Sequence, residues 1–142
     1  MPLALVAGMY HCYHLKVVPS DLDELDHVNN ARYLDYFERG RTTWYDEASL
    51  VALCVGETER SKFGTVVVNV NIDFRAECHS GEQLHVVTQP ARAGNKSFVV
   101  SQRIQKEDGA LAAEAEVTSV VMDLRTRAAV VLNASVRALF ER

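Results

Sequence analysis

A carboxylate, an imidazole and a pair of amides lie within eight residues of one another in the sequence, at Asp23, His27, Asn29 and Asn30. Either asparagine is a good helix N-cap, because its side chain can accept a hydrogen bond from an N–H of the first turn. A helix N-terminus carries about half a positive charge and free N–H groups, so it can stabilise a developing oxyanion. A carboxylate nearby can attack a carbonyl carbon or take a proton from an attacking water. This stretch predicts a hydrolytic or proton-transfer site.

The elements that would position this site are a short strand and a long helix. Residues 10–18 are typical of a strand that ends at Pro19. The apolar pattern then predicts a helix from Asn29 or Asn30 to about Ala48, with its apolar stripe at Tyr33, Phe37, Trp44 and Ala48. Gly40 lies inside this helix at a cost of about 1 kcal/mol relative to alanine. It indicates either close packing of the helix against a sheet or an ordinary tolerated glycine.

The remainder of the chain is predicted to be mainly β. Residues 50–62 indicate a loop with or without a short helix, and 64–74 alternate as a half-buried strand does. Further strands are expected at 83–90, 97–105, 112–122 and 128–132, with Asn133 capping a short helix over 134–141. Short turns between strands favour an antiparallel sheet. One helix on one face of such a sheet is an α+β fold, whose other face and edge strand favour self-association.

Composition narrows the class of protein. The chain has 142 residues, 48% of them hydrophobic and 24% charged, which suits one globular domain over 1–142. The net charge of −4 argues against nucleic-acid binding and against attraction to an anionic membrane. Three cysteines, Cys12, Cys54 and Cys78, form no C-x-x-C pair, which favours a reducing, cytoplasmic location. Four of the histidines, His11, His14, His79 and His85, show no metal-ligand spacing with one another, so we expect no metal.

The chemistry-bearing stretch also resembles a known signature. The pattern Asp21-Leu-Asp23-x-x-x-His27-Val-Asn-Asn30-x-x-Tyr33 resembles the hotdog-fold thioesterases, in particular the 4-hydroxybenzoyl-CoA thioesterase-like acyl-CoA thioesterases. Its core is also similar to that of the plant fatty acyl-ACP thioesterases. The resemblance continues through Ile72-Asp-Phe-Arg-Ala-Glu77 and Gly81-Glu-x-Leu84. It implies an antiparallel sheet of about five strands wrapped around one central helix, with paired subunits and active sites at their interface.

The resemblance also implies roles for individual residues. Asp23 matches the catalytic carboxylate of the bacterial enzymes, and His27 matches a histidine of the acyl-ACP enzymes. The backbone N–H near Asn30 matches the group that polarises the thioester carbonyl. Two positions depart from the family: many bacterial relatives have glycine where this chain has Asp26, and the plant enzymes have asparagine where it has Leu25.

Substrate contacts are expected at two places. Tyr33 and Phe37, together with the 50–62 loop and the partner subunit, would line an acyl pocket. The polar, basic cluster Arg92, Asn95, Lys96 and Ser97 suits the phosphates of coenzyme A, although a solvated turn is the favoured explanation of these residues.

We therefore expect an acyl-CoA thioesterase of fatty acid metabolism that releases a free carboxylic acid and CoA. Asp23 would act as general base or nucleophile, and no cofactor is expected beyond the coenzyme A of the substrate. The minimum assembly is a homodimer, with a homotetramer left open. One alternative is an acyl-ACP thioesterase, which should carry a basic docking patch that the sequence does not clearly offer. Others are a hotdog dehydratase or hydratase and a non-catalytic acyl-binding module.

Overall fold

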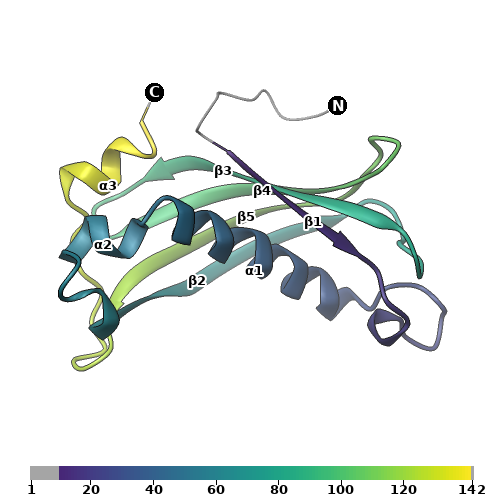
Figure 1. Cartoon of the computed structure of the whole chain (residues 1–142), viewed down its shortest axis with the longest axis horizontal. Coiled ribbons are helices and arrows are strands. Elements are labelled where there is room, and N and C mark those ends of the chain that lie inside the picture. The colour runs from purple at the N-terminus through teal and green to yellow at the C-terminus, as the bar shows by residue number, and fades with distance from the viewer. Residues whose placement is uncertain (1–9, 142) are drawn as a thin grey trace.

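The computed structural model describes residues 10–141, which form a curved sheet with one long helix lying across it (Figure 1). Two single-turn 3₁₀ helices, Pro19–Asp21 and Arg60–Lys62, lie in the connections. The principal elements, in chain order, are β1 (His11–Lys16), α1 (Asn30–Glu47), α2 (Leu50–Val55), β2 (Phe63–Phe74), β3 (Gln83–Ala93), β4 (Ser97–Lys106), β5 (Leu111–Asp123) and α3 (Ala134–Ala138).

The five strands form one sheet in the order β1-β3-β4-β5-β2, and every neighbouring pair is antiparallel. Strands β3, β4 and β5 follow one another through short turns, whereas β1 and β2 lie at opposite edges. Helix α1 crosses the concave side of this sheet, and α2 and α3 lie beyond its C-terminal end (Figure 1). The predicted α+β class and the sheet wrapped around a central helix are therefore confirmed.

The core lies between α1 and the sheet. Tyr36 and Phe37 of the helix are fully buried, as are Val86 and Val100 of the central strands. The approach is closest at Gly40, where an added Cβ would lie 2.7 Å from Val86 Cγ1. Glycine is thus required by the contact between helix and sheet, which confirms the first of the two interpretations of Gly40.

Strand β2 differs from its prediction as a half-buried strand. Val68 and Val70, expected to face the core, are exposed, and so is Phe74 at the end of the strand. The reason is the place of β2 in the sheet: among the described strands it pairs only with β5, and α1 packs mainly on β1, β3 and β4. Alternation in the sequence detects a strand but does not report which strand is the edge.

Segment 128–132 also differs, because it forms no strand. β4 begins opposite Val120, so only the last few residues of β5 have a free edge on that side. The segment makes one bridge there, between Ala129 and Met122, before Leu132 N–H donates to Asn95 O. The predicted cap of the last helix is confirmed, since Asn133 accepts from the backbone N–H of Val136 at 3.0 Å. Among the described residues no helix is long and apolar enough to cross a bilayer.

Candidate active site

The loop that joins β1 to α1 closes on itself just before the helix begins. Leu22 and Val28 form an antiparallel bridge, and Asp23 N–H donates to the carbonyl of His27 at 3.0 Å. Asp26, at the tip, has a φ of 64°, in the left-handed region that glycine adopts without cost and that aspartate tolerates better than most residues. The position where many family members carry glycine is therefore one whose backbone favours glycine.

Asp21 anchors this loop to the helix. Its buried carboxylate accepts hydrogen bonds from the Tyr36 hydroxyl at 2.8 Å and from the backbone N–H of Val18 at 3.2 Å. Arg32 lies 3.7 Å from the same carboxylate. Burial raises the pKa of the Tyr36 phenol, and its hydrogen bond to Asp21 raises it further, so Tyr36 stays a donor at neutral pH. Asp21 therefore holds the loop in position.

The helix start has the predicted cap. Asn29 Oδ1 accepts from the backbone N–H of Ala31 at 2.8 Å, with Asn29 at the N-cap. Asn30 is the first helical residue, and a helix leaves its first N–H groups without intrahelical acceptors. Val28 N–H donates to Cys78 O at 2.8 Å, which fixes the helix start against the segment that follows β2.

An imidazole between two carboxylates is the main feature of the site. Nε2 of His27 lies 3.6 Å from Asp23 Oδ1, and its Nδ1 lies 3.0 Å from Glu77 Oε2. Asp23 Oδ1 also accepts from Leu25 N–H at 2.9 Å, which fixes the carboxylate within the loop. Glu77 was not among the sequence candidates; it lies 50 residues after His27, and only the return of the chain after β2 brings it here.

A cavity of about 280 Å³ lies beside this imidazole. His27, Asn30 and Tyr33 line it from the loop and helix, and Phe74 and Glu77 line it from the end of β2. Tyr33 donates to Ala76 O at 3.1 Å and packs edge-to-face on Phe74 at 5.3 Å. Asp23 is outside this lining. The cavity can therefore place a small carbonyl group between a helix N-terminus and a histidine held by carboxylates.

Comparison with known proteins gives this arrangement a family. Residues 17–140 match the thioesterase-like superfamily. The chain is 32% identical to the long-chain acyl-CoA thioesterase FadM of Escherichia coli strain K12 over 129 residues, which cover 90% of this chain and 95% of FadM. The chain belongs to the thioesterase-like superfamily.

Two solved structures of this superfamily show the same fold. The crystal structure of YbaW, a probable thioesterase from Escherichia coli, matches with a TM-score of 0.75 and 32% identity over 91% of this chain and 95% of that chain. Slr0204, a 1,4-dihydroxy-2-naphthoyl-CoA thioesterase from Synechocystis, matches with a TM-score of 0.76 and 22% identity over 92% of this chain and 95% of that chain. The hotdog fold predicted from the sequence is confirmed, and the thioesterase-superfamily chain is a thioester hydrolase.

The remaining sequence candidates lie elsewhere in the thioesterase fold. Phe37 is buried between α1 and the sheet and is outside the lining of the 280 Å³ cavity. The cluster Arg92, Asn95, Lys96 and Ser97 surrounds the β3–β4 turn, at the opposite end of the sheet. Phe74 pairs with Ala113 and Ser97 with Val120, so a path of seven residues along β5, about 23 Å, separates the two regions. Within one chain this cluster and the cavity do not meet.

A larger hollow, of about 780 Å³, lies at the C-terminal end of α1. Tyr45, Leu50 and Phe63 are among its lining residues, so the 50–62 region borders this hollow, whereas Tyr33 and Phe37 are not among the lining residues. Among its described lining residues there is no histidine. The smaller cavity, by contrast, is lined by His27, Glu77 and the first turn of α1.

Proposed function

We propose that this thioesterase-superfamily protein hydrolyses acyl-CoA thioesters to the free acid and CoA. The observation that carries the proposal is one cavity lined by His27, Glu77 and the first turn of α1, with Asp23 held 3.6 Å from His27 Nε2. The name of its 32% identical relative FadM, a long-chain acyl-CoA thioesterase, supports a fatty acyl chain as the acid component.

The geometry favours a general-base mechanism. Glu77 lies 3.0 Å from His27 Nδ1 and keeps the ring proton on that nitrogen, which leaves Nε2, 3.6 Å from Asp23, as the base. The Asp23–His27 pair then takes the proton of a water that attacks the thioester carbon. The oxyanion that forms is stabilised by the N–H groups at the start of α1, including that of Asn30. Collapse of this intermediate breaks the C–S bond, and the departing thiolate receives the proton that His27 took from the water. In this proposal Asp23 orients His27 and balances its positive charge, instead of attacking the carbonyl itself.

The test is thiol release from acyl-CoAs of short, medium and long chain and from an aryl-CoA. Wild type should cleave one class well, and Asp23→Asn should lose about 100-fold or more in kcat, the usual scale for general acid–base catalysis. Glu24→Gln is the matched control, because Glu24 is an exposed neighbour in the same loop. Absence of cleavage of every acyl-CoA would refute the substrate, and full activity in Asp23→Asn would refute the site.

We further propose that the working unit is a dimer joined along β2. Val67, Val68 and Val70 are exposed on this edge strand, and an edge strand with exposed apolar side chains pairs readily with another copy. Phe74, at the end of β2, lines the cavity, so a second copy on this edge would lie beside the substrate. In this dimer the polar cluster at the β3–β4 turn of the second copy would bind the phosphates of the CoA held at the first copy's cavity.

Lysine substitutions test this dimer. Val68→Lys places a charge on the exposed edge, whereas Val131→Lys places the same charge at a similarly exposed valine outside the sheet. Light scattering should report a monomer with greatly reduced activity for the first variant and an active dimer for the second. A wild-type monomer with full activity would refute the dimer while leaving the proposed reaction standing.

A further inference from the structure

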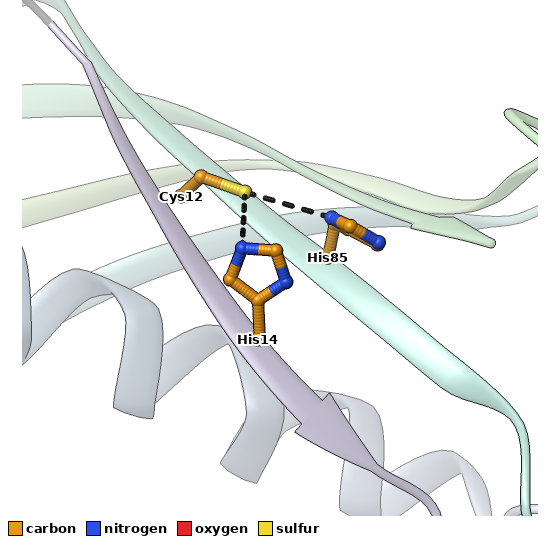
Figure 2. A group of neighbouring side chains, drawn as sticks. All are labelled: Cys12, His14 and His85. Atoms are coloured by element: carbon orange, nitrogen blue, oxygen red, sulfur yellow. Dashed lines mark hydrogen bonds between the residues drawn. The ribbon is translucent and has the colours of Figure 1, made fainter. Parts of the chain in front are cut away.

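Three potential metal ligands meet on the edge strand β1 and its neighbour β3 (Figure 2). Cys12 Sγ lies 3.8 Å from His14 Nε2 and 3.8 Å from His85 Nδ1. Cys12 and His14 are two residues apart and share a face of β1, and His14 is paired directly with His85 across the strands. The two imidazole rings pack edge-to-face, with centroids 4.4 Å apart. One thiol and two imidazoles thus point at a common volume.

The cluster lies away from the catalytic region. Residues 13 and 15 of β1 contribute to the core between the sheet and α1, so Cys12 and His14, which alternate with them, face the opposite side. Cys12 and His85 are half-buried and His14 is exposed, which leaves the volume accessible to an ion from solvent. None of the three residues lines the cavity beside His27.

The spacing of the donor atoms fits a tetrahedral cation. Zinc binds cysteine sulfur at about 2.3 Å and histidine nitrogen at about 2.0–2.1 Å, which places sulfur and nitrogen about 3.5 Å apart around a tetrahedral ion. Both S–N distances, at 3.8 Å, are close to this value. The three donor atoms lie within 4.8 Å of one another, so small side-chain rotations bring all three to bonding distance.

A carboxylate behind one imidazole provides a second, independent indication. Nε2 of His85 lies 3.6 Å from Glu107 Oε2, while Nδ1 faces the thiol. A histidine that binds a metal through one nitrogen commonly donates its other N–H to a carboxylate, which fixes the tautomer and strengthens the ligand. Glu107 therefore favours the tautomer of His85 whose Nδ1 has its lone pair directed at the cluster.

We propose that Cys12, His14 and His85 bind a zinc-like divalent cation, with a fourth coordination position left for water. One thiolate and two neutral imidazoles suit a borderline-soft ion such as Zn²⁺ and do not suit the oxygen-seeking Mg²⁺ or Ca²⁺. Burial raises the pKa of the Cys12 thiol, so the ion has to displace a proton when it binds. The bound ion would join β1, an edge strand, to the interior of the sheet.

The test is a titration of the reduced full-length protein with Zn²⁺, followed by calorimetry, and with Co²⁺, followed by absorption. Wild type should bind one Zn²⁺ per chain, and Co²⁺ should give the charge-transfer band of a thiolate ligand. Cys12→Ser, His14→Gln and His85→Gln should each weaken binding more than about 100-fold, because loss of a carboxylate behind the ligand alone costs about 10–100-fold. Glu107→Gln should show that smaller loss.

Matched controls separate this site from adventitious binding. Cys54→Ser removes another half-buried thiol, and His79→Gln removes an exposed histidine that also has a carboxylate partner; both should bind Zn²⁺ as wild type does. Zn²⁺ should raise the melting temperature of wild type and of both controls, but not that of Cys12→Ser. Failure of wild type to bind Zn²⁺, or equal binding by the three ligand variants, would overturn the proposal. Neither result depends on thioesterase activity.

Discussion

The 22–29 loop and the middle of α1 are consecutive in the chain but are held in place by different interactions. The loop is held by backbone hydrogen bonds and carries partly exposed charged groups, of which Asp23 and His27 are the closest pair. The middle of the helix is buried against the sheet with almost no free volume: a Cβ added at Gly40 would lie only 2.7 Å from Val86 Cγ1. Asp23 and His27 of the first region can therefore be changed with little loss of packing, whereas the buried side chains of the second region cannot.

This difference assigns separate tasks to the two regions. A packed helix gives a rigid platform, and the loop at its N-terminus presents reactive groups in fixed positions relative to the helix N–H groups. Substitutions of Asp23 and His27 in the loop should therefore reduce catalysis and spare stability. Substitutions in the middle of the helix, or in the strands beneath it, should reduce stability and spare the kinetics of the molecules that remain folded.

The largest effect on stability is expected at Gln102, beneath the middle of α1. Its side-chain amide donates to Phe37 O at 2.9 Å and to Thr88 Oγ1 at 2.8 Å, and its Oε1 accepts from Arg41 at 3.3 Å. Burial lowers the pKa of Arg41, and Gln102→Leu would remove an acceptor from this buried guanidinium. We expect a loss of about 3 kcal/mol in the free energy of unfolding, measured by urea denaturation.

The control for Gln102→Leu is the same change at Gln83, an exposed glutamine on β3, which should shift stability by less than about 0.5 kcal/mol. Near-wild-type kcat for folded Gln102→Leu would sharpen the comparison. A fall in kcat with unchanged stability would break it, because a group beneath the platform would then be acting in the reaction.

The next effect is expected at His27, and it should be kinetic. His27→Gln keeps a polar side chain of similar reach but removes proton transfer, so kcat should fall about 100-fold, equivalent to about 2.7 kcal/mol in the activation barrier. The melting temperature should change little, since the imidazole contacts only two partly exposed carboxylates. Glu24→Gln is the control at an exposed residue of the same loop, and a large loss of stability in His27→Gln would contradict the division of tasks.

A smaller effect on stability is expected at Gly40. Alanine would gain about 1 kcal/mol of helix propensity, but its Cβ would collide with Val86 Cγ1, and overpacking costs about 1–3 kcal/mol. We expect Gly40→Ala to lose about 1 kcal/mol net. Gly64→Ala is the control, because its nearest neighbour would be 3.7 Å away. A double variant with Val86→Ala should recover part of the loss, and equal or greater stability in Gly40→Ala alone would contradict the collision.

Much of this architecture follows from local sequence pattern. The 3.6-residue periodicity and the asparagine cap predicted α1 to within a residue at each end. Alternation with short turns predicted five strands after the helix, and four of them are present. The segment 128–132 was predicted as a strand but lacks one, because strand formation requires a free sheet edge, and only the end of β5 offers it. Whether a sheet edge is free to pair depends on the whole sheet and cannot be read from a five-residue segment.

The candidate site divides in the same way. Asp23, His27, Asn30 and Tyr33 lie on one continuous stretch, so a motif with regular spacing predicted their proximity. Glu77 and the Cys12–His14–His85 cluster were missed because their partners lie far apart in sequence. Spacing between the histidines alone led us to expect no metal, whereas antiparallel pairing of β1 with β3 places His14 opposite His85. Only the strand register carries that information.

Asp26, where the loop turns, should show the smallest effect when it is replaced by glycine. Its φ of 64° lies in a region that costs most L-residues about 1–2 kcal/mol and glycine nothing. Asp26→Gly should therefore leave unfolding within about 0.5 kcal/mol of wild type, and Asp26→Val, with its branched Cβ, should lose about 1–2 kcal/mol. Because the turn orients Asp23 and His27 through the Asp23 N–H to His27 O hydrogen bond, Asp26→Val should also lower kcat while Asp26→Gly keeps it. Equal activity in both variants would mean that Asp23 and His27 keep their relative positions without this turn. The backbone of the 22–29 loop would then not be what orients the reactive side chains, contrary to the contrast drawn with α1.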